Sequence, residues 1–187
     1  MKVPSLADVA VDMYLPEDTA AGDDACWRVP DKLHSARGNH TTSAALQVQA
    51  TKAWWFLLAR LEVLAPAAIG TLVTFGDSIT NGTRSSLDTD NRWPDHLARR
   101  LAAERGAIAG IAGNRVVSEP GNPRAGVNAL ARFDQDVLMQ PGMTHVVVLE
   151  GINDIGGARE NPSPGAADLV SGYRQLIERA RYCTPEG

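Results

Sequence analysis

Residues 71–82 read TLVTFGDSITNG, and this stretch decides the fold of the chain. The apolar and β-branched run that ends at Phe75 leads directly into Gly76, Asp77 and Ser78. The pattern indicates a buried strand that ends abruptly and presents a serine at its carboxyl end, where open α/β sheets bind ligands. Ser78 is therefore a candidate nucleophile. Asp and Ser are also favoured N-caps, so this stretch alone leaves a helix cap open as the alternative.

Two later stretches repeat the pattern of an apolar run that ends in glycine. Residues 144–154 read THVVVLEGIND, so Asn153 and Asp154 follow the glycine. Residues 110–114 read GIAGN, a shorter run in which Gly113 precedes a polar residue. Three strand-like runs of this kind predict three loops that converge on one site.

The three motifs together resemble a known family. GDSIT at 76–80, GN at 113–114 and GIND at 151–154 are similar to the first three sequence blocks of the SGNH (GDSL) hydrolases. Those proteins are serine esterases and lipases with a flavodoxin-like three-layer α/β/α fold. The resemblance covers roughly residues 70–181.

The resemblance implies a role for each motif. Ser78 would be the nucleophile, and the oxyanion would be bound by the backbone N–H groups of Ser78 and Gly113 and by the side-chain amide of Asn153. No cofactor and no metal is implied. The alternative for Asn153 and Asp154 is a turn after a strand, since both residue types favour turns.

The fourth block of the family is not found in this sequence. It is an Asp-x-x-His near the C-terminus that supplies the catalytic base and the carboxylate that orients it. The four histidines all precede Asn153; they are His34, His40, His96 and His145. We therefore expect an SGNH-hydrolase-like α/β domain at 66–187, incomplete at its C-terminal end, after a small β-rich section at 1–65.

Hydrophobic periodicity predicts the elements of both parts. In the N-terminal section, period-2 alternation predicts a half-buried strand at 6–15 and β structure within 44–65, with a polar loop at 19–43 between them. In the second part, predicted strands alternate with helices, which indicates a parallel sheet with right-handed crossovers. The predicted strands are 71–75, 107–111 and 146–149. One predicted helix begins at Arg92, and two others span 127–139 and 166–181.

The flavodoxin-like strand order places the first of these strands between the second and the third. The third strand, 146–149, would then lack an outer neighbour. An apolar edge without a partner strand favours association, so self-association through this edge is expected.

Composition and charge exclude several classes of protein. The net charge is −4 and no basic stripe is present, which argues against nucleic-acid binding. Cys26 and Cys183 are too few for a disulfide framework or a zinc site; two ordinary thiols are favoured, with a disulfide open if they meet. Met1 is followed by KVPS rather than an apolar run, so we expect no signal peptide. The sequence has no run of 18 or more apolar residues, so we expect no membrane span. The location in the cell stays open, although the family is often secreted in bacteria.

Three functional hypotheses follow. The leading one is a serine ester hydrolase that cleaves small acyl esters or acetylated carbohydrates. The alternative is a ligand- or carbohydrate-binding protein of the same fold without the catalytic histidine. A flavodoxin-like phosphate or flavin binder is least favoured, because the loop after Phe75 lacks the run of Ser, Thr and Gly that a phosphate cradle needs.

Overall fold

The computed structural model describes most of the chain. The described residues are 2–4, 7, 9–17, 27–54, 58, 60–64, 66, 70–86, 88–101, 105–157 and 164–183. They form two sheets, one of two antiparallel strands and one of three parallel strands. Cys26 lies outside the described residues, as does the side chain of Cys183. Whether the two thiols meet therefore stays untested.

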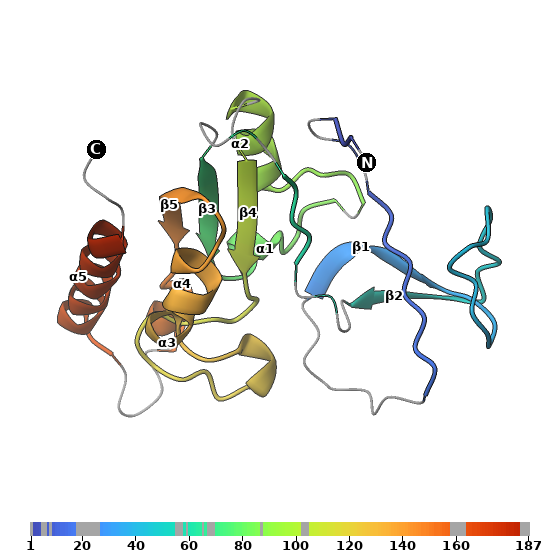
Figure 1. Cartoon of the computed structure of the whole chain (residues 1–187). Coiled ribbons are helices and arrows are strands. Elements are labelled where there is room, and N and C mark those ends of the chain that lie inside the picture. Colours follow the sequence, from blue (N-terminus) through green and yellow to red (C-terminus); the bar gives the residue numbers. More distant parts are fainter. Residues whose placement is uncertain are drawn as a thin grey trace.

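The parallel sheet is built on the strand that contains the first motif (Figure 1). Its strands are β3 (Thr71–Gly76), β4 (Arg105–Gly110) and β5 (Met143–Leu149), in the order β4-β3-β5. The register places Gly76 opposite both Gly110 and Leu149, so the three strands end at one edge. The order of second, first and third strand confirms the predicted arrangement.

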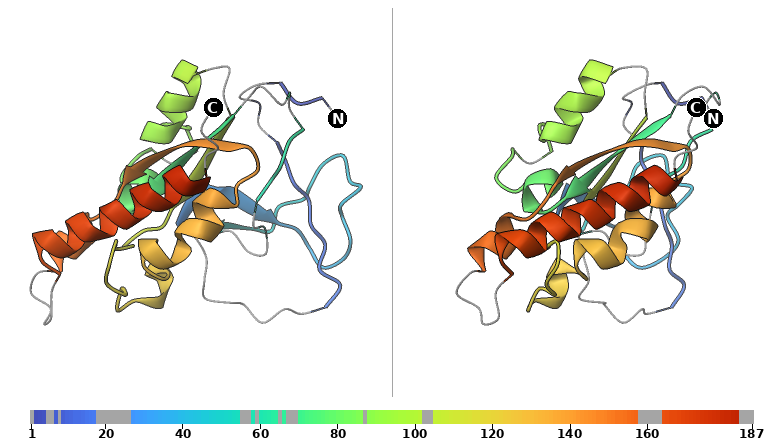
Figure 2. Two further views of the ribbon diagram at one scale, coloured as in Figure 1. Left: turned by 60° about the vertical axis from the view of Figure 1, so that its left-hand side comes forward. Right: turned by 90° about the vertical axis from the view of Figure 1, so that its left-hand side faces the viewer.

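Helices cover the sheet in two layers, as Figure 2 shows. They are α1 (Ser78–Asn81), α2 (Trp93–Leu101), η1 (Pro123–Ala125), α3 (Ala129–Phe133), α4 (Ile152–Gly156) and α5 (Ala166–Cys183). A π-helix, η2 (Asp134–Leu138), continues directly from α3. The helix α2 lies on one side of the sheet, and α3 and α5 lie on the other. The arrangement confirms the predicted three-layer α/β/α fold.

The core lies between β3 and the layer formed by α3 and α5. Val73 and Phe75 point into it and are fully buried, with Phe133 of α3 and Leu176 of α5. The rings of Phe75 and Phe133 meet edge to face, with centroids 5.4 Å apart. Each buried side chain of this size contributes roughly 1.5–3 kcal/mol to folding, so this cluster holds the strand that leads to Ser78.

The strand β5 is covered less completely than β3. Val146 and Val148 pack against the core, whereas Val147 and Leu149 on the opposite face are 38% and 42% exposed. Among the described residues, β3 is the one strand that pairs with β5. The unbroken apolar run 146–149 predicts a strand covered on both faces, and the structure covers one face more completely than the other.

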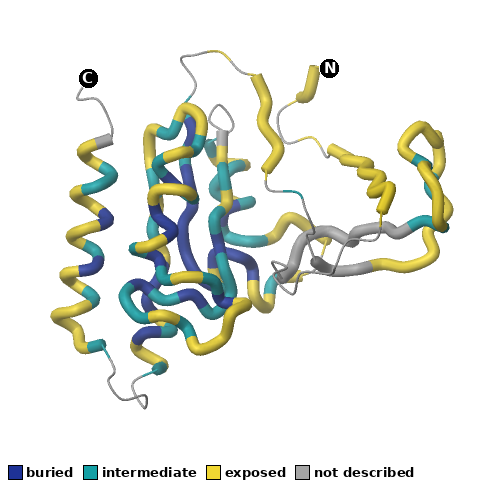
Figure 3. Tube along the Cα trace, turned by 60° about the horizontal axis from the view of Figure 1, so that its bottom comes forward, coloured by how far each residue is buried: buried dark blue, intermediate teal, exposed yellow. Residues whose placement is uncertain are grey.

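The N-terminal section differs from its prediction. Residues 9–17 form no strand and are exposed (Figure 3), so the half-buried strand is wrong over the described part of 6–15. Alternation alone gives no partner for backbone hydrogen bonds, and residues 9–17 pair with no strand. The predicted loop at 19–43 is wrong at β1 (Trp27–His34), which pairs with β2 (Ala50–Trp54).

Two details explain these N-terminal differences. Pro30 and Asp31 are residue types depleted in strands, and the pairing register of β1 shifts between Trp27 and Lys32. An irregularity of this kind accommodates a proline that the sequence pattern reads as a break. The predicted β structure at 44–65 is right at β2 and wrong at 60–64, which are irregular. The division at residue 65 stays a prediction.

Candidate active site

Ser78 is the first residue of α1, immediately after a tight turn from β3. Asp77 is the N-cap, and its Oδ1 accepts a hydrogen bond from the N–H of Ile79 at 2.9 Å. A side chain at Gly76 would collide with the carbonyl of Leu149 and with Thr80 Oγ1, so glycine is required there. The cap belongs to Asp77, which leaves the half-buried Ser78 beyond the carboxyl end of β3.

Gly113 lies in the loop that follows β4. Its φ is +83°, the left-handed region that favours glycine. The loop is anchored to the turn before Ser78, because the N–H of Ile111 donates to the carbonyl of Gly76 at 3.0 Å. The loop that carries Gly113 is therefore held next to the turn that precedes α1.

Asn153 lies in α4, which begins right after β5. The structure thus replaces the turn considered for Asn153 and Asp154 with a short helix capped by Gly151. The Nδ2 of Asn153 donates to the carbonyl of Asn114 at 2.9 Å. The buried carboxylate of Asp154 accepts from the N–H groups of Val116 at 2.7 Å and Val117 at 3.2 Å. These contacts join α4 to the loop that carries Gly113.

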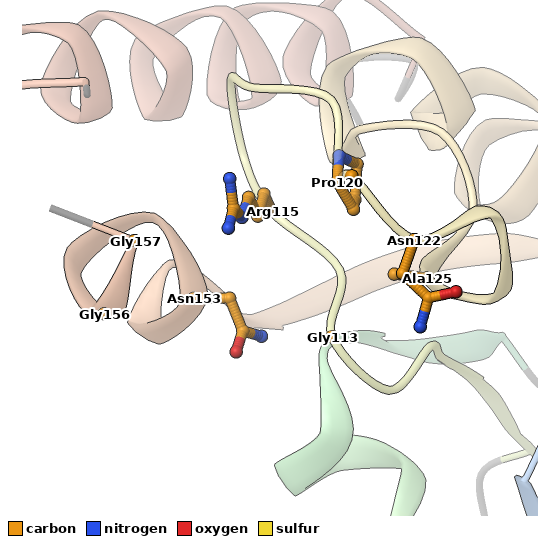
Figure 4. Close-up of a pocket in the computed structure, with 9 residues that line it drawn as sticks. Gly113, Arg115, Pro120, Asn122, Ala125, Asn153, Gly156 and Gly157 are labelled. Carbon is orange, nitrogen blue, oxygen red and sulfur yellow. The ribbon is translucent and has the colours of Figure 1, made fainter. Parts of the chain in front are cut away.

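Gly113 and Asn153 line one pocket of about 570 Å³ (Figure 4). Its side chains are small or polar; the lining is Gly113, Arg115, Pro120, Gly121, Asn122, Ala125, Asn153, Gly156 and Gly157. Ser78 is not among these residues, although the register of the strands brings it to the same edge of the sheet. That the Ser78 hydroxyl converges with Gly113 and Asn153 on one oxygen stays a prediction.

A buried guanidinium lies beneath these loops. Arg132 of α3 is 5% exposed and donates to the carbonyls of Gly76 at 2.9 Å and Ala109 at 3.0 Å. Its Nε donates to Asn114 Oδ1 at 2.9 Å, and its Nη2 donates to Glu150 Oε2 at 3.2 Å. The guanidinium also lies over the Phe75 ring, 4.0 Å from its centroid.

The carboxyl groups around Arg132 are perturbed by burial. Burial raises the pKa of Glu150 to about 8, although Arg132 acts to lower it. Burial likewise raises the pKa of Asp77, against its hydrogen bond from Ile79. Tyr173 of α5 donates to the Glu150 carbonyl at 2.7 Å, and burial raises the pKa of its hydroxyl. Burial therefore favours the protonated form of Glu150.

The described histidine side chains lie away from the pocket. His96 is exposed on α2, where its Nδ1 is 3.0 Å from Arg99 Nη2. His145 is exposed near the amino end of β5, opposite Leu72 in the register. The lining of the pocket contains no histidine. Among the described residues, no three His, Cys, Asp or Glu side chains are grouped as a metal ion requires.

Arg132, Glu150 and Asp154 were not assigned to the site from the sequence. A weak signal exists for Arg132, since it lies one residue before the apolar Phe133 and three after Ala129, on the inner side of a helix. Glu150 directly follows the apolar run 146–149, which is also unusual. Neither pattern tells which groups these side chains contact. The helices that the structure describes include none long and apolar enough to cross a membrane.

A protein family and several solved structures are similar to this chain. The model of the GDSL-like lipase/acylhydrolase family matches residues 74–186. A solved structure described as a putative arylesterase from Agrobacterium tumefaciens str. C58 is 26% identical with a TM-score of 0.51, over 59% of this chain and 54% of that one. The SGNH-hydrolase family esterase AlinE4 is 20% identical with a TM-score of 0.47, over 63% of this chain and 56% of that one.

The match covers only part of each of these two solved structures. The chain spans little more than half the length of these two solved structures. No curated protein matches it. The family model nevertheless covers more than half of the chain, from the end of β3 to the segment after α5. The chain belongs to the GDSL-like lipase/acylhydrolase family.

Proposed function

We propose that this chain carries the nucleophile and the oxyanion hole of a serine ester hydrolase. Ser78 is the nucleophile. The oxyanion is bound by the backbone N–H groups of Ser78 and Gly113 and by the side-chain amide of Asn153. The observation that carries the proposal is the hydrogen bond from Asn153 to Asn114, which holds this amide beside the loop of Gly113.

The chemistry fits these residue types. A serine hydroxyl attacks an ester carbonyl, and the negative charge that develops on the carbonyl oxygen needs preorganised N–H donors. An asparagine amide carries two N–H groups. One of them donates to Asn114, so the other is available to the oxyanion. The loops around these donors are tied to the sheet, so little free energy is needed to reorient the N–H groups during the reaction.

We propose small acyl esters or acetylated carbohydrates as substrates. The pocket beside Gly113 and Asn153 is lined by glycines, an alanine, a proline, two asparagines and an arginine. That lining offers hydrogen bonds to hydroxyl groups and little apolar area for a long acyl chain. It therefore suits a polar alcohol part and a short acyl part.

A second candidate is a ligand- or carbohydrate-binding protein of the same fold that does not turn over esters. A serine needs a base to take its proton, and the described histidine side chains lie outside the pocket. In a protease triad, loss of the histidine lowers turnover by about a million-fold. A cleft with an oxyanion hole still binds substrate after such a loss.

Labelling with a fluorophosphonate separates the two candidates. The wild-type chain and Ser78→Ala are incubated with the probe, and the labelled residue is identified by mass spectrometry. Label on Ser78 that is lost in Ser78→Ala supports the hydrolase, and Ser171→Ala on the exposed face of α5 is the control. Absence of label together with saturable binding of an acetylated sugar favours the binding protein. Hydrolysis of p-nitrophenyl acetate that Ser78→Ala leaves unchanged overturns the assignment of Ser78.

A further inference from the structure

One side chain contacts the carboxyl ends of all three parallel strands. Arg132 donates to Gly76 at the end of β3, to Ala109 in β4 and to Glu150 immediately after β5. Its fourth partner within this region is Asn114, in the loop after β4. The ring of Phe75 packs against the guanidinium plane. The hydrogen bonds of Arg132 therefore reach all three strand ends.

Three of these partners, Gly76, Asn114 and Glu150, lie close in sequence to a residue of the proposed site. Ser78 is two residues after Gly76, Gly113 directly precedes Asn114, and Asn153 is three residues after Glu150. Each residue adds only two soft backbone dihedrals. A connection of one to three residues therefore has few rotatable bonds and couples the positions of its two ends closely. Displacement of a partner of Arg132 therefore displaces the adjoining group of the site.

Asn114 continues this network into the pocket. Its fully buried side chain accepts from Arg132 Nε and donates from Nδ2 to the carbonyls of Ala125 and Val127, both at 2.7 Å. Its own carbonyl accepts from Asn153 Nδ2 at 2.9 Å. The guanidinium is thus linked through one residue to the side chain proposed as an oxyanion donor.

We propose that Arg132 is a positioning residue, which sets the mutual spacing of Ser78, Gly113 and Asn153. The inference rests on the proposed function, since the spacing matters to a reaction only if these groups carry it. Arg132 touches no reacting atom. It acts through the carbonyl of Gly76, the side chain of Asn114 and the carboxyl group of Glu150.

The chemistry of arginine suits this role. The guanidinium presents five N–H donors in a rigid plane, so several acceptors are fixed in relative position at once. A lysine keeps the charge but places its three donors on one nitrogen at the end of a flexible chain. Lysine at position 132 is therefore expected to preserve the charge balance with Asp136, 2.9 Å away, and to lose the fixed spacing.

Arg179 provides a matched control. It also donates to a backbone carbonyl, that of Leu130 at 2.7 Å, forms an ion pair with Asp134 and lies over a ring, that of Phe133 at 5.2 Å. It joins α5 to α3 and has no contact with the three loops. Arg179→Lys therefore perturbs a similar set of interactions, made with α3 and η2, without touching the proposed site.

The first test compares amide NMR spectra of the full-length wild type, Arg132→Lys and Arg179→Lys. In Arg132→Lys, the Gly113 backbone signal and the Asn153 side-chain signals are expected to shift or broaden, with the signals of Thr71 and Leu72 at the amino end of β3 largely unchanged. In Arg179→Lys, the signals of Gly113 and Asn153 are expected to stay in place. Signals that are unmoved in a folded Arg132→Lys chain overturn the proposal, and so do equal shifts in both variants.

The second test measures fluorophosphonate labelling of Ser78. The maximal labelling rate constant is expected to fall at least tenfold in Arg132→Lys, with the half-saturating probe concentration unchanged, and to stay within twofold in Arg179→Lys. An equal fall in both variants overturns the positioning role. A wild type that is never labelled counts against the proposed function, and the NMR comparison still decides whether Arg132 sets the spacing.

A measurement on the wild type covers the case in which Arg132→Lys does not fold. The Nε–H of Arg132, which donates to buried Asn114, is expected to exchange with solvent at least a hundredfold more slowly than that of the exposed Arg100. Exchange at the rate of Arg100 means that the guanidinium is not held by Asn114. That result overturns the proposal.

Discussion

The side-chain amide of Asn153 donates to the backbone carbonyl of Asn114 over 2.9 Å. Asn153 lies in α4, directly after β5, and Asn114 lies in the loop that follows β4. The bond fixes the orientation of the amide, because one of its two N–H groups is committed to Asn114. The rotation of this side chain about its last bond is thereby restricted.

Replacing Asn153 with alanine removes the amide and is expected to lower any Ser78-dependent ester hydrolysis by about a hundredfold or more, the size seen for a lost oxyanion-hole donor. The measurement is kcat with p-nitrophenyl acetate. Asn128→Ala is the control: it removes the N-cap bond to the N–H of Ala131 and costs about 1 kcal/mol of stability. Activity should be unaffected in that control. Equal losses in both variants would show that stability, not the amide, is being measured.

Gly113→Ala is expected to destabilise the fold by roughly 1–2 kcal/mol, because a residue with a Cβ is strained at φ +83°. The new Cβ would also lie 3.2 Å from the Cβ of Ala125. Urea denaturation measures the effect. Gly106→Ala in β4, where an added Cβ meets nothing within 4 Å, is expected to change stability by less than about 0.5 kcal/mol. If Gly113→Ala is as stable as the wild type, this loop adopts another conformation.

Asp154→Ala removes the acceptor of two backbone N–H groups, those of Val116 and Val117. Leaving them without a partner is expected to cost roughly 2–4 kcal/mol, measured as a shift in the denaturation midpoint. Asp154→Asn retains one oxygen acceptor and should cost less. Asp168→Ala also removes an acceptor of a backbone N–H, that of Gly165, but at an exposed position. Its cost should stay near or below about 1 kcal/mol, and a larger cost than that of Asp154→Ala contradicts the prediction.

The raised pKa of Glu150 makes the stability depend on pH. Between its usual value near 4.5 and about 8, the folded chain holds a proton that the unfolded chain has released. The free energy of unfolding therefore falls as pH rises through this range, by up to about 1.4 kcal/mol per pH unit, and levels off above it. The raised pKa of Asp77 acts in the same direction.

Glu150→Gln tests this pH dependence, because glutamine keeps an oxygen for Arg132 and does not titrate. The slope of stability against pH between 6 and 8, from urea denaturation, is expected to flatten. Glu178→Gln, on the exposed side of α5, should have the same slope of stability against pH as the wild type. A slope that Glu150→Gln does not change would place the titration elsewhere.

Self-association through β5 remains a prediction. Val147 and Leu149 are exposed along a strand that pairs with β3 alone among the described residues, and edges of this kind attract other strands. Size-exclusion chromatography with light scattering is expected to show a mass that rises with concentration. Val147→Lys should weaken this effect, whereas Val170→Lys, an exposed valine on α5, should not. A monomer at every concentration contradicts the prediction.

The parallel sheet was predictable because its signals are local. The run before Gly76 is apolar, its glycine is needed for close backbone approach, and the polar residues follow at once. The segments that end at Gly110 and Leu149 are likewise apolar runs with glycine and polar residues close behind them. Strand order followed from the family resemblance and from the regular alternation of strands and helices.

What the sequence did not predict depends on contacts between distant residues. The acceptors of Arg132 come from three separate segments, so no spacing within α3 points to them. β1 contains Pro30 and pairs with β2 across a register shift. A proline is typical of a loop in the sequence, and the register shift depends on the partner strand. The alternation at 9–15 is real, but alternation does not supply a neighbouring strand.

The order of the partners of Arg132 along the chain bears on how the protein folds during synthesis. Gly76, Ala109 and Asn114 all precede Arg132, whereas Glu150 follows it. A nascent chain emerges amino end first. The guanidinium can therefore seat on β3 and β4 as soon as α3 has left the ribosome, and β5 then adds to a partly assembled sheet. On this route the buried charge acts as an early organising contact, and Glu150 is the last partner to arrive.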